Sequence, residues 1–586
     1  MARQRLPHVM RAGARRHRRF VPQGALARLR CRASRAAFGL AFAALFLHGA
    51  NAQIPQVPNA GSTLREQQQQ PAPAPPPSDF RLQVAPPAST PPSSPGGIRF
   101  AVNAFELSGN TTIATPDLLA LLKEDTGPAR SLDDLNAAAA RITAFYRAHG
   151  YLIARAYVPP QTIDNGIVHI AISEGHFGRV ELSNQSRTRD AVLARFITPE
   201  RLGDVIDEDR LARATLLMQD VSGTTGASAT VSPGMAPGTS DLTLQIPSAR
   251  PLSGSLQVDN FGETSTGTAR VIGALQWNNP LGLGDQLGAR VLTSITGQTY
   301  GNIGYTLPLG GSGLAWGVAY TRSTYVVGGD FSSLDAHGSA NVVSTYLSYP
   351  LLRSVSANVI ATLGIDHKLL ADNLGAFNIS NDKNSDVGRF GLSGNVNFAK
   401  SISTFDASLQ QGNLRLDDPA PQQAVAQTAG AFTKFVYAFT HTQALTDATQ
   451  VYFAVNGQFT SRNLDSSEQM SLGGPYAVRA YATGDGALDQ GYVATFELRQ
   501  TIRQSLVPGL VTLIGFIDTG DGKLVAHPFL PGSNHLRLSG GGVGASLIAP
   551  GNYLLMMSYA HTLGYVPSTL GTGHANRFWL TLAKSF

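Results

Sequence analysis

The sequence predicts a transmembrane β-barrel of about 16 antiparallel strands, preceded by two small α+β domains. Three observations predict this fold class. Residues 253–586 alternate apolar and polar residues without helical periodicity, this region runs for 334 residues without a domain break, and the N-terminus has the pattern of a secretory leader. Alternation of this kind is what a strand needs when one face meets lipid and the other meets water.

Individual segments show the alternation. In "YVATFELRQT" (492–501), Tyr492, Phe496 and Leu498 share one face, while Glu497 and Arg499 lie on the other. Over three such segments, the side chains that we expect to line a polar interior are Arg270, Gln276, Asn456, Gln458, Glu497 and Arg499. A soluble β-sandwich would alternate too. The length of the region and the apolar face of the terminal strand, which ends at Phe586, favour the barrel, whose closure leaves no strand edge in lipid.

The composition excludes several other classes of protein. Only 14% of the residues are charged and the mean hydropathy is −0.03, without the run of about 18 apolar residues that a spanning helix needs after residue 52. The net charge of +6 comes from eleven Arg within residues 1–35; without them 34 basic residues face 39 acidic ones, a net charge of −5. The high pI therefore indicates a leader rather than a nucleic-acid surface.

Residues 1–52 form the expected signal peptide. A basic region leads into "AAFGLAFAALFLHGANA", which is too short for a membrane anchor and ends at a small-x-small cleavage site before Gln53. The basic region is long, so translation could begin at Met10. The single cysteine, Cys31, lies in this leader, so we expect the mature chain to have no disulfide, thiolate metal site or catalytic cysteine.

Residues 53–97 are rich in Pro and Gln and are expected to be a linker. Within it, "AGSTLREQQQQ" (60–70) predicts a short helix capped by Ser62 or Thr63. A disordered tail is the alternative for these residues.

Two modules with the order β-α-α-β-β follow. The first contains "TPDLLALLKED", with Thr115 expected as the N-cap, and "SLDDLNAAAARITAFYRAHG", with a capping box formed by Ser131 and Asp134. The second repeats the pattern through "DEDRLARATLLMQDV" and two further strands. The repetition indicates a duplicated module.

This order of segments resembles the hemolysin activation/secretion family, the outer-membrane transporters of two-partner secretion. "GYLIARAYVPPQTIDNGIVHIAISEG" (150–175), "VDNFG" (258–262) and "NNPLGLGD" (278–285) are similar to family motifs. The resemblance implies a polypeptide-transport-associated (POTRA) domain at 98–175, a second at 176–249 and an outer-membrane barrel at 250–586. It also implies that the helix at 60–70 plugs the barrel.

The resemblance gives a role to the loop "MSLGGPYAVRAYATGDG" (470–486). In the family, a Val-Arg-Gly-Tyr/Phe motif at the tip of the sixth extracellular loop pairs with an aspartate of a Phe-x-Asp-x-Gly motif on the barrel wall. The matching residues are Val478, Arg479, Ala480 and Tyr481 in the loop and Phe516, Asp518 and Gly520 on the wall. From the residues alone, a solvated loop charge at Arg479 and a turn residue at Asp518 are the favoured interpretation, because isolated charges in loops are usually solvated. The two motifs in register favour the pairing instead. Ala480 departs from the motif glycine, and would be strained if that position had a positive φ.

The expected function is a pore that recognises an exoprotein in the periplasm and translocates it to the cell surface. Exposed sheet edges at 151–158, 166–173 or 227–247 could capture an extended chain, or could instead pack the modules together. The implied partners are a large secreted adhesin or hemolysin-like protein with an N-terminal secretion domain, outer-membrane lipid, and the barrel-assembly machinery. No motif predicts an enzyme, a cofactor or a metal site. The alternative is a barrel-assembly factor of the same superfamily.

Overall fold

The computed structural model describes residues 57–68, 83–84, 99–197, 204–236, 238–417, 426–502, 507–564 and 575–586. The predicted signal peptide and most of the predicted linker lie outside these residues. Among the helices that the structure describes, none combines the length and apolar character needed to span a bilayer.

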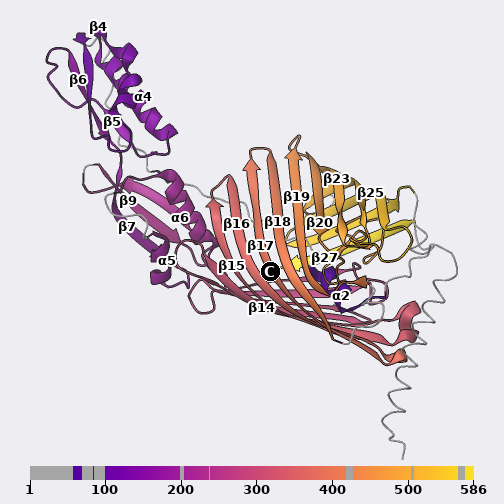
Figure 1. The fold of residues 1–586 in the computed structure, drawn as a ribbon. Coiled ribbons are helices and arrows are strands. Elements are labelled where there is room, and N and C mark those ends of the chain that lie inside the picture. Colours follow the sequence, from indigo (N-terminus) through magenta and orange to yellow (C-terminus); the bar gives the residue numbers. More distant parts are fainter. Residues whose placement is uncertain are drawn as a thin grey trace, which may run out of the picture. The chain divides into compact units, whose positions relative to one another are not determined.

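A closed barrel of sixteen antiparallel strands follows the two modules, as the sequence predicts (Figure 1). Each strand pairs with its neighbours in chain order. The strands are β10 (Leu252–Asp259), β11 (Arg270–Asn278), β12 (Gln286–Ser294), β13 (Gln298–Pro308), β14 (Ala315–Val326), β15 (Ala336–Arg353), β16 (Ala357–Leu374), β17 (Ile379–Phe398), β18 (Ser401–Asp417), β19 (Gly430–Ala444), β20 (Thr449–Thr460), β23 (Gln490–Ile502), β24 (Leu510–Lys523), β25 (His535–Ala549), β26 (Tyr553–Thr562) and β27 (Asn576–Ser585).

The barrel closes where its first and last strands meet. β10 pairs with β27 over Ser255–Asp259 only. Directly before this stretch of β10, Gly254 and Phe586 exchange both backbone hydrogen bonds, at 3.0 and 3.1 Å. Directly after this stretch, the Asn260 side chain accepts a hydrogen bond from the Leu580 N–H and donates one to the Phe578 carbonyl, both at 2.8 Å. Phe586 therefore extends the seam by one further pair, and a side-chain amide continues it at the other end.

The outer face of the barrel is apolar and the inner face is polar, as the sequence predicts. Large apolar side chains are exposed on the outside; Leu363 has an exposed fraction of 58% and Phe496 one of 50%. Inward positions of the strands carry buried polar groups, such as Arg270, Gln458 and Glu497. Lys584 lies on the outer face, where its Nζ reaches the Gly551 carbonyl and the ring of Tyr553. This is the snorkelling expected of a lysine at the end of a lipid-facing strand.

The first module has an apolar core between a three-stranded sheet and its helices. Its elements are β2 (Phe100–Val102), β3 (Ala104–Ser108), α3 (Thr115–Ala120), η1 (Lys123–Asp125), β4 (Gly127–Arg130), α4 (Leu132–Ala148), β5 (Arg155–Tyr157) and β6 (Ile167–Ser173). The predicted capping box of Ser131 and Asp134 is present at the start of α4. The predicted Thr115 cap is wrong, because Ala114 occupies the N-cap position and Thr115 is the first helical residue.

The second module repeats the arrangement. It contains β7 (His176–Asn184), α5 (Asp190–Ile197), α6 (Glu208–Asp220), β8 (Ser228–Pro233) and β9 (Thr239–Ile246). One strand was not expected from the sequence: β1 (Gln83–Val84), a piece of the linker, runs parallel to β8 at its outer edge. Backbone pairing of this kind depends on little side-chain information, so a Pro-rich segment gave no signal for it.

The strand orders revise the candidate capture edges. In the first module the order is β3-β6-β5, so 166–173 forms the central strand and not an edge. In the second module the order is β1-β8-β9-β7, so β9 is central and the outer edge of β8 is covered by β1. Of the three predicted segments, 151–158 alone contributes an edge strand, β5, without a second strand partner among the described residues.

Candidate functional site: loop 6 within the barrel

Loop 6, residues 461–489, connects β20 to β23, the eleventh and twelfth barrel strands. It contains a two-stranded ribbon of β21 (Met470–Ser471) and β22 (Ala487–Leu488). Its apolar side chains pack with residues of the barrel wall in one buried cluster, which includes Leu472, Val478, Tyr481, Phe516 and Leu538. Glycines are frequent here because the loop must turn tightly; Gly474, Gly484 and Gly486 have positive φ angles.

Arg479 at the loop tip and Asp518 on β24 lie together, at the positions that the family motif implies. Arg479 Nε is 2.8 Å from Asp518 Oδ2, and Nη2 is 2.8 Å from Oδ1. The Arg479 backbone N–H adds a third bond to the same carboxylate at 3.1 Å. Asp518 is completely buried. A buried carboxylate needs such compensation, and the forked donor gives the pair a fixed geometry.

Further groups surround the guanidinium. Its Nη1 donates to Glu497 Oε1 on β23 at 2.7 Å. Glu497 also accepts a hydrogen bond from Arg499 Nε at 2.8 Å and forms an ion pair with Arg499 Nη2 at 2.7 Å. The Phe516 ring lies beneath it, with 3.5 Å between Arg479 Cζ and the ring centroid. Such stacking favours arginine over lysine. The sequence placed Glu497 on the polar face but did not identify it as a partner, since alternation gives a face and not a pairing.

Trp579 is a functional candidate that the sequence reasoning missed. This β27 side chain points inward, is 5% exposed, and donates from Nε1 to the Arg479 carbonyl at 2.7 Å. Its ring also meets Phe261 edge-on, with centroids 5.6 Å apart. The sequence did offer a signal for Trp579, since an aromatic residue stands there on the otherwise polar face of the terminal strand.

Ala480 fits where the family motif has glycine. Ala480 is not among the non-glycine residues with positive φ, and its side chain is buried. The methyl group faces Gly540 of β25, where an added Cβ would lie 2.5 Å from that of Ala480. Likewise, a Cβ at Gly520 would lie 2.8 Å from Leu472 Cδ2. The two wall glycines therefore give the loop tip its close approach to the wall.

A helix, α2 (Ala60–Gln68), packs inside the barrel against β14, β15 and β16, although its residues precede both modules (Figure 1). It begins after Asn59, whose side chain accepts from the Ser62 N–H, so the predicted Ser62 or Thr63 cap is wrong. Glu66 Oε1 is 2.7 Å from Arg270 Nη1, and Arg270 is also held by Asp259 of β10. The polar half of the helix thus meets the polar face of the barrel.

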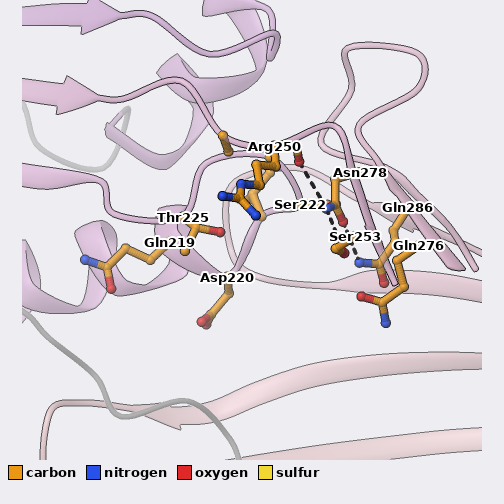
Figure 2. A pocket seen from close by; sticks show the side chains of 12 residues that line it. Gln219, Asp220, Ser222, Thr225, Arg250, Ser253, Gln276, Asn278 and Gln286 are labelled. Carbon is orange, nitrogen blue, oxygen red and sulfur yellow. Dashed lines mark hydrogen bonds between the residues drawn. The ribbon is translucent and has the colours of Figure 1, made fainter. Parts of the chain in front are cut away.

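A polar pocket of about 490 Å³ lies where the end of α6 meets β10, β11 and β12. Figure 2 shows Asn278 at its rim, in hydrogen bonds with Arg250, Ser222 and Gln286. Next to the pocket, Arg353 of β15 makes a forked pair with Asp220 at 2.7 and 2.8 Å. In the described part of the chain, no group of three or more His, Cys, Asp or Glu side chains is placed to hold a metal ion.

Comparisons with known proteins identify the family of this chain. The family model for the haemolysin secretion/activation protein ShlB/FhaC/HecB matches residues 238–547, and that for the ShlB-type POTRA domain matches residues 100–175. The heme/hemopexin transporter protein HuxB of Haemophilus influenzae is 29% identical over 501 residues, covering 84% of this chain and 88% of HuxB. The outer membrane transporter CdiB of Dickeya dadantii is 23% identical, covering 76% and 80%. The solved structure of CdiB from Escherichia coli superposes with a TM-score of 0.68 at 22% identity, covering 86% and 94%.

A sixteen-stranded outer-membrane barrel that follows a POTRA domain and carries an inward-folded loop 6 defines a class of polypeptide transporters. Since its model matches more than half of the chain, this protein belongs to the haemolysin secretion/activation family. It is an outer-membrane transporter of two-partner secretion, with its POTRA region in the periplasm, and it moves an exoprotein to the cell surface. The family model is that of the secretion transporters, which supports this function over the barrel-assembly alternative.

Proposed function

We propose that this chain exports a large exoprotein that carries an N-terminal secretion domain, through a lumen that loop 6 and α2 close at rest. The observation that supports this most directly is the triple hydrogen bonding of Arg479 to the buried Asp518. A loop held so firmly inside a pore blocks free diffusion, yet without a covalent bond it can be displaced by a passing chain.

Capture of the exoprotein would begin in the periplasm. The second module, 176–249, acts as a second POTRA domain beside the one at 98–175. The edge of β5 in the first module accepts an extended segment by strand addition. In the second module, the linker strand β1 occupies the comparable edge of β8, so a chain that binds there must first displace it.

Movement through the lumen requires no nucleotide. Folding of the exoprotein outside the cell supplies the direction of transport, and the protein acts as a pore rather than as an enzyme. The lipid of the outer membrane and the barrel-assembly machinery are its further partners. Because HuxB is a heme/hemopexin transporter, a hemopexin-binding exoprotein is the first partner to test.

The role of loop 6 is tested by Arg479→Ala. Removing the guanidinium leaves Asp518 buried without its main partner, so we expect export of the exoprotein to fall at least tenfold. Arg322→Ala is a matched control, because Arg322 is exposed and bonds Asn341 on the neighbouring strand. Immunoblots of the medium measure export, and heat-modifiable migration in gels measures barrel insertion. Normal export by Arg479→Ala with an inserted barrel would remove this role.

The plug is tested separately by deleting residues 60–70. Single-channel recordings in planar bilayers should then show higher conductance than the intact chain. An unchanged conductance would count against the plug.

A further inference from the structure

The first part of loop 6 has its own attachment to the barrel, on other strands than those that hold the Arg479 tip. Glu468 Oε1 is 2.5 Å from Lys368 Nζ on β16, and Glu468 Oε2 is 2.8 Å from Lys434 Nζ on β19. Lys434 also donates to the Glu468 carbonyl at 3.0 Å. These strands differ from β23, β24 and β27, which hold the loop tip. Loop 6 therefore has two separate attachments.

A third lysine completes the cluster. Lys383 Nζ on β17 is 3.0 Å from Asp465 Oδ2 in the loop and 3.3 Å from Asp372 Oδ2 on β16. All six side chains of the cluster are almost completely buried. Three lysines thus face three carboxylates, and two of these carboxylates, Asp465 and Glu468, come from the loop. If the loop segment left, Lys383 would keep Asp372, whereas Lys368 and Lys434 would lose the Glu468 carboxylate that they share, so the charges resist its departure.

The same loop segment contacts α2. Ser466 Oγ donates to Asn59 Oδ1 at 2.6 Å, and Arg65 Nη1 donates to the Ser466 carbonyl at 3.0 Å. Gly61 packs so closely that an added Cβ would lie 2.3 Å from Ser466 Oγ and 2.6 Å from the Ser467 nitrogen. The start of the helix also reaches the charge cluster, since the Ala60 N–H donates to Asp372 Oδ1 at 2.6 Å.

We propose that Lys368, Lys383 and Lys434 form a second anchor of loop 6, and that the segment 465–468 which they hold is the seat of α2. The inference rests on the proposed role of α2 as a plug. In this proposal the lysines position the loop segment that contacts the helix. Loss of the second anchor should therefore unseat the helix while the Arg479–Asp518 pair stays in place.

The test is the frequency of open-channel events of the full mature chain in planar lipid bilayers. Glu468→Gln keeps the shape of the side chain and removes the charge that two lysines share, so we expect at least a tenfold rise in open events. Asp366→Asn is the matched control: Asp366 is a lumenal carboxylate on the same strand, β16, and pairs with Arg389 of the wall. We expect its open-event frequency to stay within twofold of the unmodified chain.

A second variant guards against a general loss of folding. Gly61→Ala retains all six charged groups and crowds Ser466, so it should also raise the open events at least tenfold. Heat-modifiable migration must be retained by both variants. If both variants match the unmodified chain while deletion of 60–70 raises conductance, the second anchor is overturned and the plug stands.

The other outcomes are equally decisive. If deletion of residues 60–70 leaves the conductance unchanged, the plug is overturned, and this inference with it. A rise in Glu468→Gln but not in Gly61→Ala overturns the seat, because the lysines would then close the lumen through loop 6 alone.

Discussion

The barrel and the first module use opposite arrangements of the same residue types. In the module, Leu135, Ile142 and Tyr146 of α4 are buried with 0–1% of their surface exposed. In the barrel, comparable apolar side chains face outward, and the buried groups include Asp518, Glu468 and Lys368. The difference shows which solvent each region meets. The module excludes water from an apolar core, whereas the barrel presents apolar side chains to lipid and encloses its charges.

The largest difference should appear on truncating one apolar side chain in the module core. Ile142→Ala removes three carbons from a completely buried site and leaves a cavity, which costs about 2–5 kcal/mol. Hydrogen exchange of the β6 amides in the full chain measures this loss as faster exchange. Equal exchange rates in the variant would contradict a packed core here.

Two adjacent residues on β13 allow the outer and inner faces of the barrel to be compared directly. Ile303 is 49% exposed on the outer face, while the neighbouring Asn302 bonds Thr321 on the inner face. Ile303→Arg should cost about 2–4 kcal/mol in folding into lipid vesicles if the residue lies near the midplane. Asn302→Arg, the control, should cost less than half as much. Urea titrations followed by tryptophan fluorescence report on the barrel, since Trp277, Trp316 and Trp579 all lie in its strands. Equal costs would break the assignment of the two faces.

The smallest expected effect is the loss of stability at low pH that comes from Glu174, a buried carboxylate of the first module. Glu174 accepts hydrogen bonds from Thr111, Thr112 and Tyr146. Burial raises the pKa of Glu174, but these hydrogen bonds outweigh it and lower the pKa to about 2. The carboxylate therefore stabilises the module fully above the pKa of a glutamate in an unfolded chain, about 4.3. This contribution disappears as the pH falls toward the folded-state pKa of about 2.

Between pH 5 and pH 2 the module should lose roughly 1–3 kcal/mol from this group. Thermal unfolding followed by the helical circular dichroism signal measures the loss. Glu174→Gln should be less stable than the unmodified chain at pH 7 and nearly independent of pH in this range. The same pH slope in both proteins would refute the role of Glu174.

Residue alternation predicted the two faces of each strand, because one face per strand is encoded locally, and the count of alternating segments predicted about 16 strands. The choice of a barrel over a soluble sandwich also needed the secretory leader, the length of the region and the apolar face of the terminal strand. The helices of the two modules were predicted from helical periodicity and from the capping box of Ser131 and Asp134, although the predicted Thr115 cap was wrong. Pairings across the chain could not be predicted from the local pattern. The Arg479–Asp518 contact came from a family motif. Alternation placed Glu497 and Trp579 on the polar face of their strands, but it did not indicate a contact of either residue with Arg479. The same holds for the lysine cluster, since Lys368, Lys383 and Lys434 are isolated residues on three strands.

Several local features of the structure differ from what the sequence pattern predicted. Asn59 caps α2 because its side chain reaches Ser62, although Ser62 and Thr63 looked like suitable caps. The strand β1 arises in a Pro-rich segment, where composition argues against any strand. In the first module, 166–173 became the central strand rather than an edge, and sheet order cannot be read from the strands alone.

The most direct test reconstitutes the mature chain in lipid vesicles and adds an unfolded N-terminal fragment of its exoprotein on the POTRA side. The account predicts that the fragment becomes protected from added protease with the unmodified chain, and stays unprotected with Arg479→Ala or with empty vesicles. A fragment that remains fully digestible beside a correctly inserted unmodified barrel would contradict transport through this pore.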